Sequence, residues 1–328
     1  MPANLPPAYF EAEKRYREAK TPAEGITALE EMLAIMPKHK GTDKLKADLR
    51  RRISKLKSKQ QGKKKTARRE SSYRIETEGV GQVVLIGPPN VGKSALVAAL
   101  TNADPLVADF PHSTWKPTPG MMYFENIQIQ LIDTPPISKE YMEPWVFDMA
   151  RRSDMILVVV DVQTDPLQQL EETISFLKEH RIAPLKLTHL YEGKGGWTFL
   201  PFLVSANKND DQSSDENFEI FRSLLEDEWP LVSVSAKTGR NLDALKQTLF
   251  TSLEIIRVYT RASGKAPDLS APFVLQRGSK LEDLASKIHK DFLEKLKYAR
   301  VWGRHVYDGQ MVQRDHVLQD GDVVELHL

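Results

Sequence analysis

The stretch Gly87–Ser94, GPPNVGKS, places two glycines, a lysine and a serine at the spacing G-x-x-x-x-G-K-S. It follows the apolar run VVLI and precedes KSALVAAL, which has helical spacing. In this strand–loop–helix context, backbone N–H groups surround phosphate oxygens and the helix N-terminus adds its dipole. We expect Lys93 to reach the β- and γ-phosphates and the Ser94 hydroxyl to ligate Mg²⁺. The residues expected to contact the nucleotide here are Gly87, Pro88, Pro89, Asn90, Val91, Gly92, Lys93, Ser94 and Ala95.

A second polar group, NKND, stands at the end of the apolar run PFLVSA. The Asp210 carboxylate could accept both N–H donors on the edge of guanine, where adenine presents an acceptor. Asn207 could bridge the base and the phosphate-binding loop, and the stem of Lys208 could cover the base. Each motif is short, but their order is specific. The expected base contacts are Asn207, Lys208 and Asp210, with Ser235, Ala236 and Lys237 of the following SAK motif.

Between these motifs lie two loops that could respond to a γ-phosphate. Asp133, at the end of IQIQLID, is expected to hold Mg²⁺ through a water molecule. Thr114, in DFPHSTWKPTPG, is the candidate for closing over the γ-phosphate and Mg²⁺, and we expect it to share the catalytic role with Lys93.

The sequence DTPPI places Pro136 where a glycine N–H normally contacts the γ-phosphate. Proline lacks that N–H and fixes φ near −65°, and Ile137 cannot hold an attacking water. Two interpretations stay open. Either the loop is stiff and senses the γ-phosphate poorly, or Pro136 shapes a turn while a neighbouring N–H does the sensing.

The elements that position these residues alternate between strands and helices. QVVLIG, IQIQLID, MILVVVDV, PFLVSAN and LVSVSA are short, β-branched and nearly continuous in apolar character, as in strands buried on both faces. Helices are expected over 93–102, 166–179 and 241–256. This alternation predicts a doubly wound α/β domain.

The two ends of the chain have different compositions. Residues 1–70 hold 19 Lys/Arg and 9 Asp/Glu, whereas the whole chain has a net charge of +1. Two helices are expected there, the first capped by Thr21 and the second by Thr42. The basic second helix could be a solvated face, an RNA or ribosome contact, or a contact with an anionic membrane. Toward the other end, strand, helix and strand patterns from Ala271 predict a small α+β module, in which Tyr298 and Trp302 are expected in the core.

The remaining composition excludes several classes. Without cysteine there are neither disulfides nor Cys-ligated zinc. No run of 18 apolar residues occurs, so no membrane span is expected, and no export signal is recognisable. We therefore expect a cytoplasmic protein. We also expect it to be a monomer.

The motifs GPPNVGKS, FPHSTW, DTPP, NKND and SAK together resemble those of Obg-related translation-factor GTPases, most closely the developmentally regulated GTP-binding protein branch. MPKHKGTDKLKADLRRRISKLK resembles that branch's N-terminal helices. PFVLQRGS, IHKDFLEKLKYARVWG and DHVLQDGDVVEL resemble its C-terminal TGS domain, a β-grasp module. The resemblance implies a basic helical region and linker over 1–75, a P-loop GTPase domain with a doubly wound, mostly parallel sheet over 80–262, and a TGS domain over 268–328.

The chain also departs from that branch. Its members carry an additional domain between the DxxG and NKxD motifs, but here only 73 residues separate Asp133 from Asn207. Ser113 replaces the first threonine of a Thr-Thr pair, and Pro136 replaces the DxxG glycine. Asn90 matches an asparagine that ligates K⁺ in several related GTPases.

The resemblance implies a Mg²⁺-dependent GTPase that binds GTP and GDP. We expect a slow conformational switch, stimulated by K⁺, that associates with the ribosome or other RNA through the basic arm and the TGS domain. The alternative is an RNA- or ribosome-associated adaptor that binds guanine nucleotide with little or no hydrolysis. An ATPase is disfavoured because NKND is retained.

Overall fold

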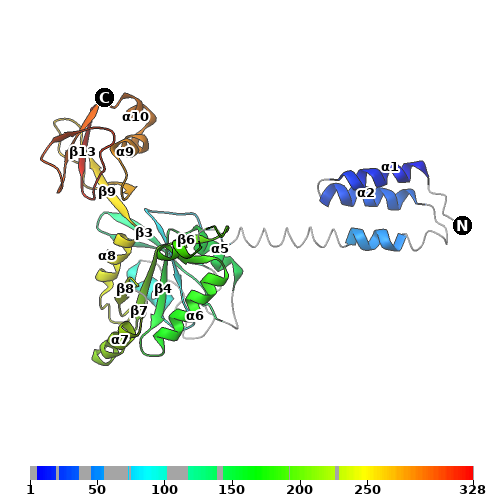
Figure 1. Ribbon diagram of the computed structural model, residues 1–328, viewed down its shortest axis with the longest axis horizontal. Helices are drawn as coiled ribbons and strands as arrows, with labels where there is room; N and C mark the ends of the chain where they lie inside the picture. Colours follow the sequence, from blue (N-terminus) through cyan, green and yellow to red (C-terminus); the bar gives the residue numbers. More distant parts are fainter. Residues whose placement is uncertain are drawn as a thin grey trace. The chain divides into compact units, whose positions relative to one another are not determined.

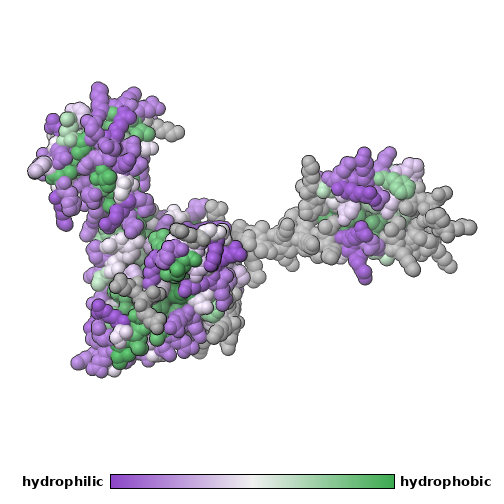
Figure 2. Space-filling view, viewed as in Figure 1, coloured by the Kyte–Doolittle hydropathy of each residue, from purple (hydrophilic) through white to green (hydrophobic). Residues whose placement is uncertain are grey.

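The computed structural model describes residues 6–19, 22–36, 46–54, 73, 75–101, 117–138, 143–191, 193–225 and 229–327. The chain forms two compact units, Met1–Arg74 and Ile75–Leu328. Among the described residues, no helix has the length and apolar character needed to cross a membrane. Figure 2 shows polar residues over most of the visible described surface, with apolar residues in separate groups between them.

In the part of the first unit that the structure describes lie α1 (Pro7–Glu18), α2 (Pro22–Ile35) and a helix over 46–54 (Figure 1). The apolar spacing of each segment gives one buried stripe, as expected for an amphipathic helix. Their shared core contains Tyr9, Ala12, Ile26, Leu29, Met32, Met36, Leu49 and Ile53. The expected caps Thr21 and Thr42 and the basic segment 57–70 lie outside the described residues.

The second unit contains a six-stranded sheet in the order β2-β3-β1-β4-β7-β8. The strands are β1 (Gln82–Ile86), β2 (Thr118–Phe124), β3 (Ile127–Asp133), β4 (Met155–Asp161), β7 (Phe202–Asn207) and β8 (Leu231–Ser233). All neighbouring pairs are parallel except β2–β3, which is an antiparallel hairpin. Every residue of β1, β4 and β7 is buried, which explains their continuous apolar character.

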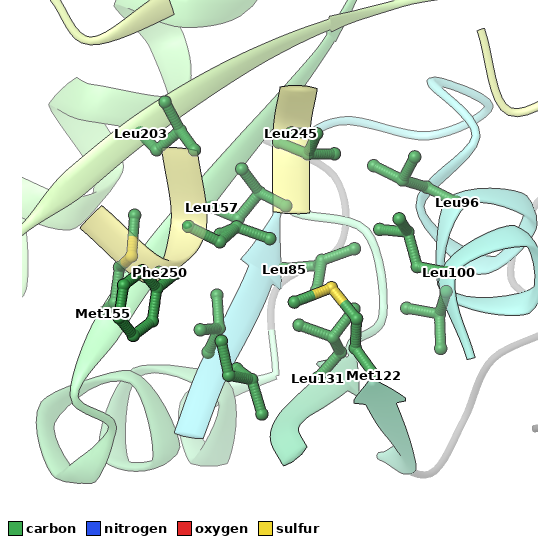
Figure 3. Packing of buried hydrophobic residues seen from close by; sticks show 14 of the residues in the cluster. Leu85, Leu96, Leu100, Met122, Leu131, Met155, Leu157, Leu203, Leu245 and Phe250 are labelled. Atoms are coloured by element: carbon green, nitrogen blue, oxygen red, sulfur yellow. The ribbon is translucent and has the colours of Figure 1, made fainter. Parts of the chain in front are cut away.

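Helices cover both faces of this sheet. They are α4 (Lys93–Leu100), α5 (Pro144–Arg152), α6 (Pro166–Glu179), α7 (Gln212–Leu224) and α8 (Leu242–Ser252), and Figure 1 shows α6 and α8 on opposite sides. In Figure 3, leucines of α4 and α8 pack on Leu85, Leu157 and Leu203 from three adjacent strands. The expected doubly wound, mostly parallel α/β domain is confirmed.

Two features of this domain were not expected. The edge strand β2 was missed. Its sequence, TPGMMYF, contains a proline and a glycine, and its residues alternate between buried and more exposed positions. A two-stranded parallel sheet of β5 (Ile182–Pro184) and β6 (Thr198–Leu200) also occurs, with the 3₁₀ segment η2 (Leu185–Tyr191) between its strands.

The helix expected over 241–256 is too long. α8 ends at Ser252, Glu254 takes a positive φ of 51°, and β9 (Ile255–Thr260) follows at once. β9 hydrogen bonds to the second, smaller sheet and not to the first. The expected division between 262 and 268 therefore leaves β9 with the wrong sheet.

The smaller sheet has the order β10-β9-β13-β11-β12. Its other strands are β10 (Phe273–Gln276), β11 (Tyr298–Trp302), β12 (Gln310–Val312) and β13 (Val323–His327). α9 (Leu281–Ile288) packs on one face through Leu281, Leu284 and Ala285. The helix expected in this module is interrupted at the extended residue His289, after which α10 (Lys290–Lys295) begins.

The expectation that Tyr298 and Trp302 lie in the core is wrong. Side chains alternate along β11, and it is Ala299 and Val301 that face the core. On the opposite face, the Trp302 ring lies 4.2 Å from the Arg261 guanidinium, and the Tyr298 ring stacks on His327 at 4.5 Å.

The turn of the β2–β3 hairpin contacts the smaller sheet. Arg257 of β9 forms ion pairs with Glu125 in this turn and with Asp320, and its guanidinium lies 4.8 Å from the Phe250 ring of α8. Asn126 of the same turn donates to the Tyr259 hydroxyl at 2.7 Å. Side chains of the smaller sheet thus bond directly to the hairpin.

Candidate nucleotide-binding site

The segment 87–94, which we call the P-loop, joins β1 to α4 as expected. Its two glycines are required by close packing. A Cβ on Gly87 would lie 2.3 Å from the Val159 carbonyl oxygen of β4. Gly92 has φ +90°, and a Cβ there would lie 2.4 Å from Nδ2 of Asn207. At these two glycines the loop backbone therefore lies so close to β4 and β7 that a side chain would not fit.

Lys93 is buried at the first position of α4, with 6% of its surface exposed. Its Nζ donates to the carbonyl oxygens of Gly87 and Pro88, both at 2.9 Å. Burial lowers the pKa of Lys93 from 10.5 to about 8, an effect that the Asp133 carboxylate partly opposes. The ammonium is thus held inside the loop, where phosphate oxygens could replace these carbonyl oxygens as acceptors.

Ser94 and Asp133 meet beside the P-loop. The Ser94 hydroxyl donates to Oδ2 of Asp133 at 2.5 Å, and Asp133 is 1% exposed at the end of β3. A hydroxyl and a carboxylate are oxygen ligands of the kind that Mg²⁺ prefers, so this pair fits a magnesium ion. Thr114, the third expected ligand, lies outside the described residues.

The loop after Asp133 packs against the P-loop. Thr134 donates through its hydroxyl to the Leu85 carbonyl at 2.5 Å, and the Ile137 N–H donates to the Gly87 carbonyl at 3.1 Å. Pro136 is buried, and the Ile137 side chain is 3% exposed. The N–H that follows Pro136 is therefore bonded to the P-loop in this structure.

Asn207 connects three parts of the candidate site. Its Nδ2 donates to the Val91 carbonyl at 2.8 Å, and its Oδ1 accepts from the Ala236 N–H at 3.0 Å. It therefore joins the end of β7 to the P-loop and to the SAK loop, residues 235–237. The expected link to the P-loop is present, and the link to Ala236 was not foreseen.

The other residues expected at the base lie close to Asn207. The Ser235 hydroxyl donates to Oδ1 of Asp210 at 2.5 Å, which orients the carboxylate. Lys237 is 83% exposed, and its Nζ lies 3.9 Å from Oδ2 of Asp210. Lys208 has φ +64°, and its Nζ forms an ion pair with Asp161 at 2.6 Å. The structure thus brings the NKND loop, residues 207–210, and the SAK loop together.

The remaining P-loop residues have less distinct surroundings. Pro88 and Pro89 are half-buried in the turn, Val91 is buried, and Ala95 is half-buried in the first turn of α4. Asn90 is exposed with φ +63°, so its side chain is accessible for a ligand.

Sequence reasoning missed a buried polar group behind the NKND and SAK loops, which we call the base loops. Asn209, the variable residue of NKND, is 0% exposed, and it bonds to Asp215, Ser233 and Arg240. The only signal in the sequence was an arginine directly after SAKTG, which gives no indication of its partner.

Two family models match the chain. Residues 82–188 match a 50S ribosome-binding GTPase model, and residues 256–328 match the TGS domain. The second match begins within β9, in agreement with the pairing of that strand in the smaller sheet.

Curated relatives match most of the chain. An uncharacterized GTP-binding protein of Methanocaldococcus jannaschii is 29% identical over 361 residues, covering 92% of each chain. Developmentally-regulated GTP-binding protein 1 of Xenopus laevis is 27% identical, covering 77% of this chain and 84% of that protein. Developmentally-regulated G-protein 2 of Arabidopsis thaliana is 24% identical, covering 92% of this chain and 90% of that protein.

The alignment of 361 residues is longer than this chain of 328, so the archaeal relative has residues without a counterpart here. The order of the two domains is nevertheless the one inferred from the motifs. With its P-loop, its NKND and SAK loops and its C-terminal TGS domain, the chain is a GTP-binding protein that combines a region matching the 50S ribosome-binding GTPase model with a TGS domain, and over most of its length it is similar to the developmentally regulated GTP-binding proteins.

Proposed function

We propose that this protein hydrolyses GTP to GDP and phosphate as a slow conformational switch that acts on the ribosome or another RNA. The observation that carries the proposal is the contact between Ser94 and Asp133 beside a P-loop that Asn207 joins to both base loops. These contacts support the proposal because they bring together the residues expected to hold the phosphates, Mg²⁺ and the base.

In the proposed reaction, water attacks the γ-phosphate in line with the leaving oxygen, and the protein contributes positioning and charge. Lys93 would stabilise negative charge on the phosphates, and Ser94, Asp133 and Thr114 would hold Mg²⁺. The ion, when bound, neutralises charge between the β- and γ-phosphates. Ser94 Oγ and Asp133 Oδ2 are close enough together to serve one ion.

Slow turnover is supported by the DTPPI loop. Pro136 has no N–H, the Ile137 N–H is bonded to Gly87, and the Ile137 side chain offers no polar atom to the attacking water. Thr114 remains the main candidate for sensing the γ-phosphate. We further propose that Asn90 ligates K⁺, which places a cation near the phosphates, and that hydrolysis is therefore faster in KCl than in NaCl. Equal rates in the two salts would remove that role.

The same loop favours a second candidate function, an RNA- or ribosome-associated adaptor that holds guanine nucleotide with little or no hydrolysis. Single-turnover hydrolysis of GTP by the purified protein, with Mg²⁺ and K⁺, distinguishes the two. Phosphate release that is lost in Lys93→Ala supports the switch. Stoichiometric GTP binding without release of phosphate supports the adaptor.

An RNA or ribosome partner is supported by the 19 basic residues among positions 1–70. Such a partner would place the protein in the cytoplasm, where we propose that it acts as a monomer. Sedimentation in a sucrose gradient with a GTP analogue and with GDP tests the association. Absence from ribosomal fractions in both nucleotide states would contradict it.

A further inference from the structure

Asn209 lies between two residues expected to contact the base, yet its own side chain points away from solvent. It is 0% exposed and uses both polar atoms of its amide. Its Nδ2 donates to Oδ1 of Asp215 at 2.9 Å and to the Ser233 hydroxyl, and its Oδ1 accepts from the Arg240 guanidinium at 3.2 Å. A buried amide with all of these partners is held in one orientation.

Arg240 contacts the two base loops by different parts of the residue. Its guanidinium donates to Asn209 in the NKND loop and to Oδ2 of Asp215 at 2.9 Å. Its carbonyl oxygen accepts from the Ser235 N–H of the SAK loop at 3.1 Å. Arg240 thus fixes the distance between the ends of β7 and β8.

These contacts close a ring around the expected guanine carboxylate. Asp210 accepts from the Ser235 hydroxyl, the Ser235 N–H bonds to Arg240, Arg240 bonds to Asn209, and Asn209 precedes Asp210 in the chain. Asp215, in the first turn of α7, supports the ring from outside. A shift of any one member would therefore be expected to move Asp210 relative to Ser235.

We propose that Asn209 and Arg240 are positioning residues for guanine recognition, and that they hold Asp210 at the angle needed to bond two N–H groups of the base at once. The inference rests on the proposed role of Asp210 at the guanine edge. Neither residue is expected to touch the nucleotide itself.

The ion pair between Arg240 and Asp215 does not by itself explain this arrangement. Both side chains are about two-fifths exposed, at 39% and 41%, and pairs in such surroundings contribute little. The bond from Arg240 to the buried Asn209 has the larger effect, because its loss would leave a buried amide oxygen without its donor. We therefore expect Arg240 to affect guanine recognition through its bond to Asn209 and through the position of the NKND and SAK loops.

The experiment compares GDP with inosine diphosphate, whose base lacks the 2-amino group but keeps the N1–H. In the parent protein, GDP should bind more tightly by about tenfold, because Asp210 makes two bonds to guanine and one to hypoxanthine. In Arg240→Ala, the ratio of the two affinities should fall about fivefold, since a displaced Asp210 no longer reaches both donors. A purely structural role would weaken both nucleotides equally and leave the ratio unchanged.

Two further variants make the result specific. Arg222→Ala removes an exposed arginine from α7 whose ion pair with Glu219 is long, at 3.9 Å, and it should keep the parental ratio. Arg240→Lys keeps the charge but cannot bond Asn209 and Asp215 with one planar group, so the ratio should fall as well. If Arg240→Lys and Arg240→Ala both keep the parental ratio, the inference is wrong. If instead the parent protein itself binds both nucleotides equally, the proposed role of Asp210 fails, which is a separate outcome.

Discussion

At the scale of single residues, Lys93 is a titrating group inside a binding loop. Its pKa of about 8 results from burial, because removal from water disfavours the charged ammonium more than the nearby Asp133 carboxylate favours it. Near pH 8 the free protein therefore holds this site in a mixture of charged and neutral forms. Nucleotide phosphates favour the charged form, which links binding to a proton.

We expect GDP binding to take up a proton near pH 8, and the affinity to fall as the pH rises through 8. The sign follows because bound phosphate raises the Lys93 pKa above its free value, so the complex holds the proton that the free protein loses. Calorimetric titrations in two buffers with different ionisation enthalpies measure this uptake. Binding heats that do not depend on the buffer between about pH 8 and 9 would argue against a titrating Lys93.

Without nucleotide, the same group affects stability with a defined sign. Its pKa is about 8 when folded and 10.5 as the ordinary value, so the unfolded chain holds more protons between those limits. The contribution of Lys93 to the free energy of unfolding should therefore rise with pH over this window.

Pro136 gives the second prediction at this scale. Pro136→Gly restores an N–H and backbone freedom close to the P-loop, and a bond to a charged group contributes about 1.5–3 kcal/mol. The preference for GTP over GDP should increase by about tenfold or more, as measured by competition binding with a non-hydrolysable GTP analogue. If both the affinity ratio and the hydrolysis rate stay at parental values, the proline does not determine sensing of the γ-phosphate.

At the scale of elements, the P-loop is fitted to its neighbours at Gly92. Gly92→Ala should destabilise the fold by about 1–3 kcal/mol and weaken nucleotide binding, since the methyl group meets the buried Asn207 amide in a left-handed backbone conformation. Denaturant unfolding and GDP titration measure the two effects. Gly264→Ala is the matched control, because Gly264 has φ +74° with nothing within 4 Å of a Cβ. If the two variants lose equal stability, the contact with Asn207 has no effect beyond backbone strain.

The elements differ in how far the sequence predicted them. β1, β4 and β7 could be predicted because strands buried on both faces need continuous apolar residues, and the P-loop, NKND and SAK motifs could be placed because each is local. β2 is buried on one side only and was missed. Leu245, Leu249, Phe250 and Leu253 keep helical spacing up to Ile255 and Ile256, so the end of α8 was not visible. Arg240 and Asn209 are 31 positions apart, and their bond depends on how β7 and β8 pair.

At the scale of the whole molecule, charge is divided unevenly. Removing residues 1–70 takes away an excess of ten positive charges, whereas the nucleotide motifs all begin at Gly87 or later. The truncated protein should bind GDP as the parent does but associate with ribosomes or RNA more weakly, with a flatter salt dependence. Cosedimentation at several salt concentrations measures this. Parental binding after truncation would show that the arm is not the contact.

β9 connects the two sheets of the second unit in a way that affects how this unit unfolds. Ile255 belongs to the core beneath the six-stranded sheet, whereas Ile256 and Val258 belong to the core of the smaller sheet. Adjacent side chains of β9 thus belong to two hydrophobic cores. Both cores would lose side chains if β9 detached from the sheet. The unit should melt in a single cooperative step, with the same midpoint for the fluorescence of Trp145 in α5 and of Trp302 in β11 when each is kept as the sole tryptophan. Two separate midpoints would mean that the GTPase and TGS domains can unfold independently despite the strand they have in common.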